Sequence, residues 1–194
     1  MVWRVCGVAG LLGVGSIGLA QSSFYFEIEH TTLLPGQSTQ VQLWAAFPAA
    51  DHSVAGIWTS LRSSTGSEGF SDMRIVPPLD GPGTTAGTLS ATGVDDILAG
   101  QLMFPICGIG GCPPSINPIV FWEATYTAPA DATPMALDLS TLTSRFDVYP
   151  ELLNPRSESR LEGLVEASAT IHIVPAPAGV FALALGLVCV RRRR

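Results

Sequence analysis

Alternation of apolar and polar side chains with a period of two residues constrains this chain more than any other feature. The pattern is clear over 24–28, returns over 41–47 and again over 54–61. A period of two is that of a β-strand with one face buried. Proline and glycine interrupt the pattern at short intervals, and residues 21–173 show no convincing amphipathic helix. The sequence therefore predicts an all-β fold for this region.

Turn signals set the expected limits of the strands. Leu34-Pro-Gly-Gln37 and 48–53 are typical of turns, and 77–87 is too rich in proline and glycine to hold regular structure. The segment 119–127 is apolar on both faces, which makes it the best candidate for a central strand. Further strands are expected at 94–104 (one or two short ones), 135–142, 145–149, and in a closing segment that ends at Ile173. Eight or nine short strands in a region of about 150 residues predict an Ig-like or jelly-roll two-sheet β-sandwich.

The N-terminal segment, residues 1–20, has the composition of a secretory signal peptide. Arg4 precedes an apolar, glycine-rich stretch, and small residues stand at 18 and 20. This order predicts a signal helix that signal peptidase removes between Ala20 and Gln21. A retained membrane anchor is the alternative.

The C-terminal segment, 174–194, combines a short motif, an apolar run over 178–190 and an arginine cluster. The run would span about 25 Å as a helix from position 174, short of the roughly 30 Å hydrocarbon core, and snorkelling arginines would make up the difference. Each arginine costs on the order of 3 kcal/mol at mid-membrane, so the cluster stops transfer and stays cytoplasmic. The motif residues are Val174, Pro175, Ala176 and Pro177, and the cluster is Arg191, Arg192, Arg193 and Arg194.

This order of motif, short transmembrane helix and terminal arginines resembles the PEP-CTERM sorting signal. The resemblance covers about 20 residues and implies processing by an exosortase-type membrane peptidase. Ala176 stands where the family motif has Glu, so the variant of sorting enzyme that would recognise it is open. A plain C-terminal anchor is the alternative. No Leu-Pro-x-Thr-Gly motif of the Gram-positive sortase type occurs.

The region between the two ends is strongly acidic. All 16 acidic residues of the chain fall between Glu27 and Glu166, the same stretch holds five arginines, and the chain has no lysine, so this stretch carries a net charge of −11. A domain of that charge repels nucleic acid and anionic lipid. We therefore expect no nucleic-acid partner.

Cys107 and Cys112 are the two cysteines outside the apolar ends, and four residues separate them. In an exported protein a close pair predicts a disulfide, which would stabilise the fold by about 2 kcal/mol. A metal site is the weaker interpretation because two thiols lack the further ligands that zinc needs. No other motif predicts a metal or cofactor.

Candidate catalytic residues form no recognised motif. The three histidines, His30, His52 and His172, lie in no zinc-peptidase arrangement, and no nucleophile-elbow motif occurs. Asp51 beside His52 is the start of a possible triad with a distant serine, but the simpler interpretation is an exposed turn.

Carboxylates are the second group of candidate catalytic or metal-binding residues. Glu27, Glu29 and Glu123 are candidates for glycoside hydrolysis if two of them converge in a cleft. The alternative for Glu123 is an outward-facing residue on the solvent side of a sheet. Asp95 and Asp96 are candidate calcium ligands, but their spacing matches no defined calcium loop and a solvated turn is the better interpretation.

Three aromatic residues are candidates for carbohydrate contacts. Trp44 lies on the Gln40 and Gln42 face of its strand, and with Tyr25 or Trp58 exposed beside it the rings would stack on sugars. Burial under a loop or against the second sheet is the alternative.

Three segments together loosely resemble the sandwiches of cohesins and carbohydrate-binding modules. They are an opening turn at 35–37, the apolar strand at 118–122 and Arg145-Phe-Asp-Val-Tyr149. Together these features predict an exported cell-surface or extracellular-matrix protein with a non-catalytic β-sandwich for adhesion or binding, anchored in the membrane before its tail is processed. The alternatives are a module that binds extracellular polysaccharide and, third, a secreted hydrolase.

Overall fold

Eleven strands form the framework of the described part of this chain, residues 21–101, 116–151 and 156–175 of a computed structural model. Most are bounded by the proline and glycine turns that the sequence shows. They are β1 (Ser23–Ile28), β2 (Thr32–Leu33), β3 (Ser38–Ala46), β4 (Ser53–Ser63), β5 (Phe70–Ile75), β6 (Thr88–Ser90), β7 (Gly93–Gly100), β8 (Ile119–Thr127), β9 (Met135–Tyr149), β10 (Glu158–Ser159) and β11 (Ser168–Ile173).

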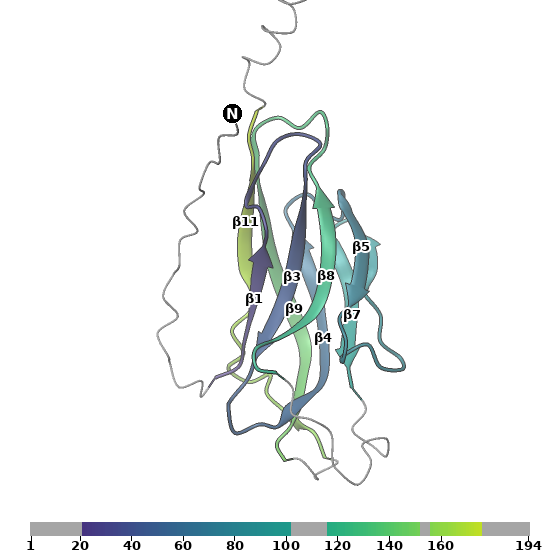
Figure 1. Cartoon of the computed structure of the whole chain (residues 1–194), viewed down its shortest axis with the longest axis vertical. Coiled ribbons are helices and arrows are strands. Elements are labelled where there is room, and N and C mark those ends of the chain that lie inside the picture. The colour runs from purple at the N-terminus through teal and green to yellow at the C-terminus, as the bar shows by residue number, and fades with distance from the viewer. Residues whose placement is uncertain (1–20, 102–115, 152–155, 176–194) are drawn as a thin grey trace, which may run out of the picture.

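The strands make two sheets that pack face to face (Figure 1). The four-stranded sheet has the order β1-β3-β8-β5. The seven-stranded sheet has the order β2-β11-β9-β4-β7-β6, with β10 added to β9. Every pairing is antiparallel except that of β11 with β2. The predicted all-β, two-sheet sandwich is confirmed.

Aromatic rings from both sheets meet in the core. Phe24 on β1 lies with its ring centroid 5.3 Å from that of Phe121 on β8 and 5.2 Å from that of Phe146 on β9, in the opposite sheet. A register shift between β3 and β8 allows Phe121 and its neighbour Trp122 both to be fully buried. This bulge explains why the sequence of β8 is apolar on both sides.

Several expected elements are found as predicted. The strand at 119–127 is β8, an inner strand of its sheet, and the closing strand is β11. The turn at 34–37 closes with a 3.0 Å hydrogen bond from the Gln37 amide to the Leu34 carbonyl, and Gly36 supplies the positive φ of 77° that such a turn requires. The loop at 77–87 holds no strand.

Other elements differ from the prediction. The two strands expected at 135–142 and 145–149 are one continuous strand, β9, which crosses the whole sheet. β5 was not predicted because Asp72 adopts a left-handed φ of 52° and a register shift follows, so its side chains do not alternate evenly. β2, β6 and β10 are two or three residues long, too short to give a periodic signal.

The predicted signal helix at 1–20 and the predicted transmembrane helix at 178–190 lie outside the described residues. Within the described ranges, no helix has the length and apolar character needed to cross a membrane.

Candidate binding faces of the sandwich

The outer face of the seven-stranded sheet carries large apolar side chains in contact with solvent. Trp58 on β4 is 41% exposed and Leu142 on β9 is 59% exposed. Strand register places Trp58 between Leu98 on β7 and Arg145 on β9. Alternation explains the position of Trp58, because its neighbour Ile57 points into the core and is fully buried.

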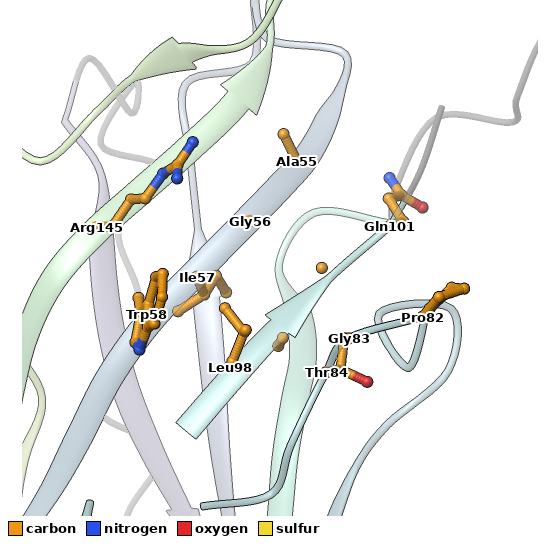
Figure 2. A pocket seen from close by; sticks show the side chains of 12 residues that line it. Ala55, Gly56, Ile57, Trp58, Pro82, Gly83, Thr84, Leu98, Gln101 and Arg145 are labelled. Carbon is orange, nitrogen blue, oxygen red and sulfur yellow. The ribbon is translucent and has the colours of Figure 1, made fainter. Parts of the chain in front are cut away.

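A pocket of about 260 Å³ opens beside Trp58 (Figure 2). Gly56 and Gly100 leave its floor without side chains, and Leu98 lies across the sheet from the Trp58 ring. The loop segment 82–84 forms the far wall. This segment is held against the sheet by a reciprocal pair of 2.9 Å backbone hydrogen bonds between Thr85 and Leu98.

Arg145 lies at the edge of the pocket and is held there by Asp147, two residues along the same strand. The Nε of Arg145 donates to Oδ2 of Asp147 at 2.6 Å, and Nη2 lies 2.5 Å from the same oxygen. The Asp147 side chain is only 10% exposed whereas that of Arg145 is 58% exposed. The carboxylate therefore orients the guanidinium and balances its charge, which leaves a nearly neutral pocket.

The described lining of the pocket is mostly apolar and carries one charged side chain, that of Arg145. Among the described residues that line it, none is Asp, Glu, His, Cys or Ser. Its volume is below the roughly 300–1,000 Å³ of drug-sized ligand sites. It would hold one apolar side chain or one ring, with Trp58 as a wall and Arg145 as a donor at the rim.

The outer face of the four-stranded sheet carries the other two predicted aromatic contacts. Tyr25 on β1 stacks on Trp44 on β3, with centroids 6.1 Å apart and an interplanar angle of 11°. Tyr25 is 37% exposed, and burial together with the nearby Glu27 carboxylate raises the pKa of its phenol. Nε1 of Trp44 has no hydrogen-bond partner among the described residues. Trp44 thus lies on the predicted face of its strand, partly buried and stacked with Tyr25.

The three aromatic residues do not form one row. Tyr25 and Trp44 lie on the four-stranded sheet, whereas Trp58 lies on the outer face of the seven-stranded sheet, on the opposite side of the sandwich. Two separate surfaces result, and they are named here the Trp58 face and the Tyr25 face. The Trp58 face includes Trp58, Leu98, Leu142 and Arg145. The Tyr25 face includes Tyr25, Gln42, Trp44, Arg74 and Glu123.

Glu123 points outward from its sheet, as expected if it is not catalytic, but Arg74 and Gln42 cover its carboxylate. Its side chain is 11% exposed, Nε and Nη2 of Arg74 both contact Oε1, and the Gln42 amide lies 3.3 Å from Oε2. Glu27 lies on β1, the edge strand of its sheet, and Glu29 follows directly after that strand ends.

Asp51 was predicted to be an exposed turn residue, and this prediction is wrong. Its side chain is 3% exposed and accepts two hydrogen bonds from Arg160, at 2.7 and 2.9 Å. The same bonds raise the pKa of Arg160 above its ordinary value. The pair fastens the turn before β4 to the segment after β10, 109 residues away in sequence.

The remaining polar candidates are dispersed. Asp95 and Asp96 lie within β7 rather than in a turn, and Asp95 pairs with Arg62 at 2.6 Å. His30 lies 3.6 Å from Glu29 at the end of β1, and His172 is exposed on β11. No group of three potential metal ligands occurs in the described ranges.

Several predicted sites lie outside the described residues. These are the Ala20 side of the cleavage site, the pair Cys107 and Cys112, Ala176, Pro177 and the arginine cluster. Val174 is described, and its amide donates to the Leu33 carbonyl at 2.9 Å, so the predicted sorting motif begins directly where β11 leaves the sheet.

Comparison with known proteins gives structural neighbours only. No protein-family model and no curated protein matches the chain. Among solved structures, the seventh ScaB type I cohesin of Pseudobacteroides cellulosolvens is similar, with 14% identity and a TM-score of 0.57, over 81% of this chain and 94% of that one. The fold is cohesin-like. A cohesin module of a family 33 glycoside hydrolase from Clostridium perfringens is also similar, with 10% identity and a TM-score of 0.50, over 80% of this chain and 98% of that one.

Sequence reasoning found Trp58 but missed its neighbours in the cohesin-like sandwich. Leu98 and Arg145 lie 40 and 87 positions further along the chain, and only register brings them beside Trp58. Leu142 is placed by the same register opposite Ser60, two residues along β4 from Trp58. One signal was present: Leu142 is a leucine at an outward position of a strand whose other outward residues are mostly polar.

Proposed function

We propose that this protein is an exported surface protein whose cohesin-like sandwich is a non-catalytic module that binds another protein through the Trp58 face. The observation that carries the proposal is the exposed Trp58 side chain, which lines a small neutral pocket on a sheet face. The exposed Leu142 lies on the neighbouring strand of the same face, opposite Ser60.

Several properties of the Trp58 face support a protein partner. Exposed apolar groups that gather at one place on a soluble protein are typical of interaction sites. Tryptophan and arginine are the residues that most often dominate the binding energy of protein interfaces, usually beside a pocket that a partner side chain fills. Trp58, Arg145 and the glycine-floored pocket supply this combination, and the flat sheet around them supplies area for a rim.

Export and sorting are the second part of the proposal. We infer that signal peptidase cleaves between Ala20 and Gln21, that Cys107 and Cys112 form a disulfide, and that an exosortase-type peptidase processes the tail at the 174–177 motif. The support is the order of segments in the sequence: motif, apolar run, four arginines. The described domain would then lie at the cell surface or in the extracellular matrix.

Site-specific photo-crosslinking tests the protein-binding face. A photoreactive amino acid at position 142 is expected to crosslink the full chain to one discrete protein on intact cells. The same probe at position 27, on the four-stranded sheet, is the matched control and should give no such product. Trp58→Ala should abolish the crosslink from position 142, because a central tryptophan commonly contributes about 2 kcal/mol or more to an interface. Equal crosslinking with Trp58 and with alanine would overturn the proposal.

Mass spectrometry of the two ends of the purified mature protein tests export and sorting. The proposal predicts an N-terminus at Gln21 and a C-terminus between 174 and 190. Replacement of Arg191–Arg194 by glutamine should leave the N-terminal cleavage intact but prevent the C-terminal one. A cytosolic chain with both ends uncut would overturn this part and leave the binding face to be judged by the crosslink alone.

A further inference from the structure

The Tyr25 face presents two parallel rows of side chains across the four-stranded sheet. Strand register pairs Tyr25 with Trp44, and Trp44 with Val120, in an apolar row. Two residues along β1 and β3, and three along β8 because of its bulge, the register pairs Glu27 with Gln42 and Gln42 with Glu123. Glu123 in turn pairs with Arg74, which completes a hydrogen-bonding row. Adjacent strands lie about 4.8 Å apart and alternate residues on one face about 7 Å apart, so the two rows run side by side.

The hydrogen-bonding row is held rigid by its own contacts. Arg74 and Gln42 both donate to the Glu123 carboxylate, one from each side. The Arg74 side chain is 70% exposed, which leaves its guanidinium edge open to a ligand. Planar amide, carboxylate and guanidinium groups fixed on a sheet are the groups that bind the hydroxyls of a sugar.

The apolar row supplies a surface of a different kind. Tyr25 stacks on Trp44 and is 37% exposed, so its ring is open to a ligand. The faces of aromatic rings are electron-rich and attract weakly positive C–H groups, whereas ring edges are weakly positive. A pyranose with equatorial hydroxyls has C–H groups on its flat faces and hydroxyls around its rim. An aromatic row next to a hydrogen-bonding row therefore matches both parts of such a ring.

Charge selects among polysaccharides. The one cation of the two rows, Arg74, is neutralised by Glu123, and Glu27 adds a negative charge. The stretch from Glu27 to Glu166 carries −11 in all. An anionic polysaccharide would be repelled, whereas a neutral one would not. We propose that the Tyr25 face binds a neutral β-linked glucan chain, independently of the protein-binding Trp58 face.

Affinity electrophoresis of the full chain in mild detergent tests this proposal. The probe is hydroxyethylcellulose, a neutral β-glucan, in the gel. Carboxymethylcellulose, which has the same backbone with added negative charge, is the matched polymer control. The chain is expected to be retarded by the neutral polymer and less by the anionic one. Tyr25→Ala should weaken retardation about tenfold, the equivalent of one lost ring contact.

Two variants separate binding from folding and from the proposed function. Tyr25→Phe keeps the ring and should retain most of the retardation, while Trp58→Ala removes a ring from the opposite face and should change nothing. Thermal melting confirms that Tyr25→Ala is folded, as its exposure leads us to expect. Unchanged mobility of the parent chain in hydroxyethylcellulose, equal retardation of Tyr25→Ala, or stronger retardation by carboxymethylcellulose would each overturn the glucan proposal. None of these outcomes bears on crosslinking at position 142.

Discussion

The two outer faces of this sandwich share one core and one rule of alternation, yet they present different chemistry. On the seven-stranded sheet, Trp58 and Leu142 are exposed, and a pocket lies next to Trp58. On the four-stranded sheet, Tyr25 covers Trp44, and polar groups form a continuous row. The comparison teaches that the inward residues determine the fold, while the outward residues of the same strands are free to specify separate partners.

The largest loss of stability is expected in the core between the two sheets, because both outer faces depend on its packing. Phe146→Ala should destabilise the protein by about 3–5 kcal/mol, because Phe146 is fully buried and its ring meets Phe24 of the opposite sheet. Denaturant unfolding measures the change. Binding at both faces should weaken together, and loss at one face with an unchanged unfolding midpoint would contradict the shared-core view.

A smaller loss of stability is expected when the buried ion pair between Asp51 and Arg160, beside the seven-stranded sheet, is broken. Arg160→Ala leaves the buried Asp51 carboxylate without its two hydrogen bonds. We expect a loss of about 2–3 kcal/mol, below the upper range for buried pairs because Arg160 is itself partly exposed. Chemical unfolding gives the free energy. Asp51→Asn in the Arg160→Ala background is the control, since it removes the unpaired charge and should recover part of the loss.

The same substitution on each face sharpens the comparison further. Arg74→Ala and Arg145→Ala each uncover a carboxylate that is nearly buried, Glu123 and Asp147 respectively. Glu123 keeps the Gln42 amide as a donor, whereas Asp147 has no second donor among the described residues. Arg145→Ala should therefore cost about 1–2 kcal/mol and Arg74→Ala about 1 kcal/mol or less. Unfolding curves at one pH test the order, and the reverse order would refute it.

The smallest effect concerns pH and the four-stranded sheet. Burial, with a contribution from Glu68, raises the pKa of Tyr126 above 10.0, and a hydrogen bond with Thr65 opposes this in part. The folded state therefore favours the neutral phenol. The corresponding stability is fully present below pH 10.0 and is lost as the pH rises through the pKa of the folded state. The urea midpoint of unfolding should fall between about pH 8 and about pH 11, and it should fall less in Tyr126→Phe than in the parent chain. An identical decline would remove Tyr126 as a cause.

Much of the fold could be predicted from the sequence because alternation and turn residues act locally. β8 was found because its sequence is apolar at consecutive positions, and β1, β3 and β4 because each keeps a period of two. β5 was missed because a left-handed residue and a register shift disturb its alternation. β9 was divided in two because Thr143, Ser144 and Arg145 interrupt the apolar pattern at the position of another register shift.

The candidate sites were harder to predict because they depend on pairing between distant strands. The sequence makes Tyr25, Trp44 and Trp58 candidates for one exposed row, but it does not show which sheet each strand joins. The three were therefore grouped, although they lie on opposite sides of the sandwich. Asp51 was expected to be exposed because its partner, Arg160, lies 109 residues away.

The exit of the chain from the sandwich has a mechanical consequence. Val174 leaves the end of β11, which pairs with β9 on one side over six residues and with β2 on the other. Tension applied at residue 174 along the axis of β11 would load both rows of backbone hydrogen bonds simultaneously, in shear. A strand pulled lengthwise between two neighbours resists detachment better than one that is peeled from an edge bond by bond.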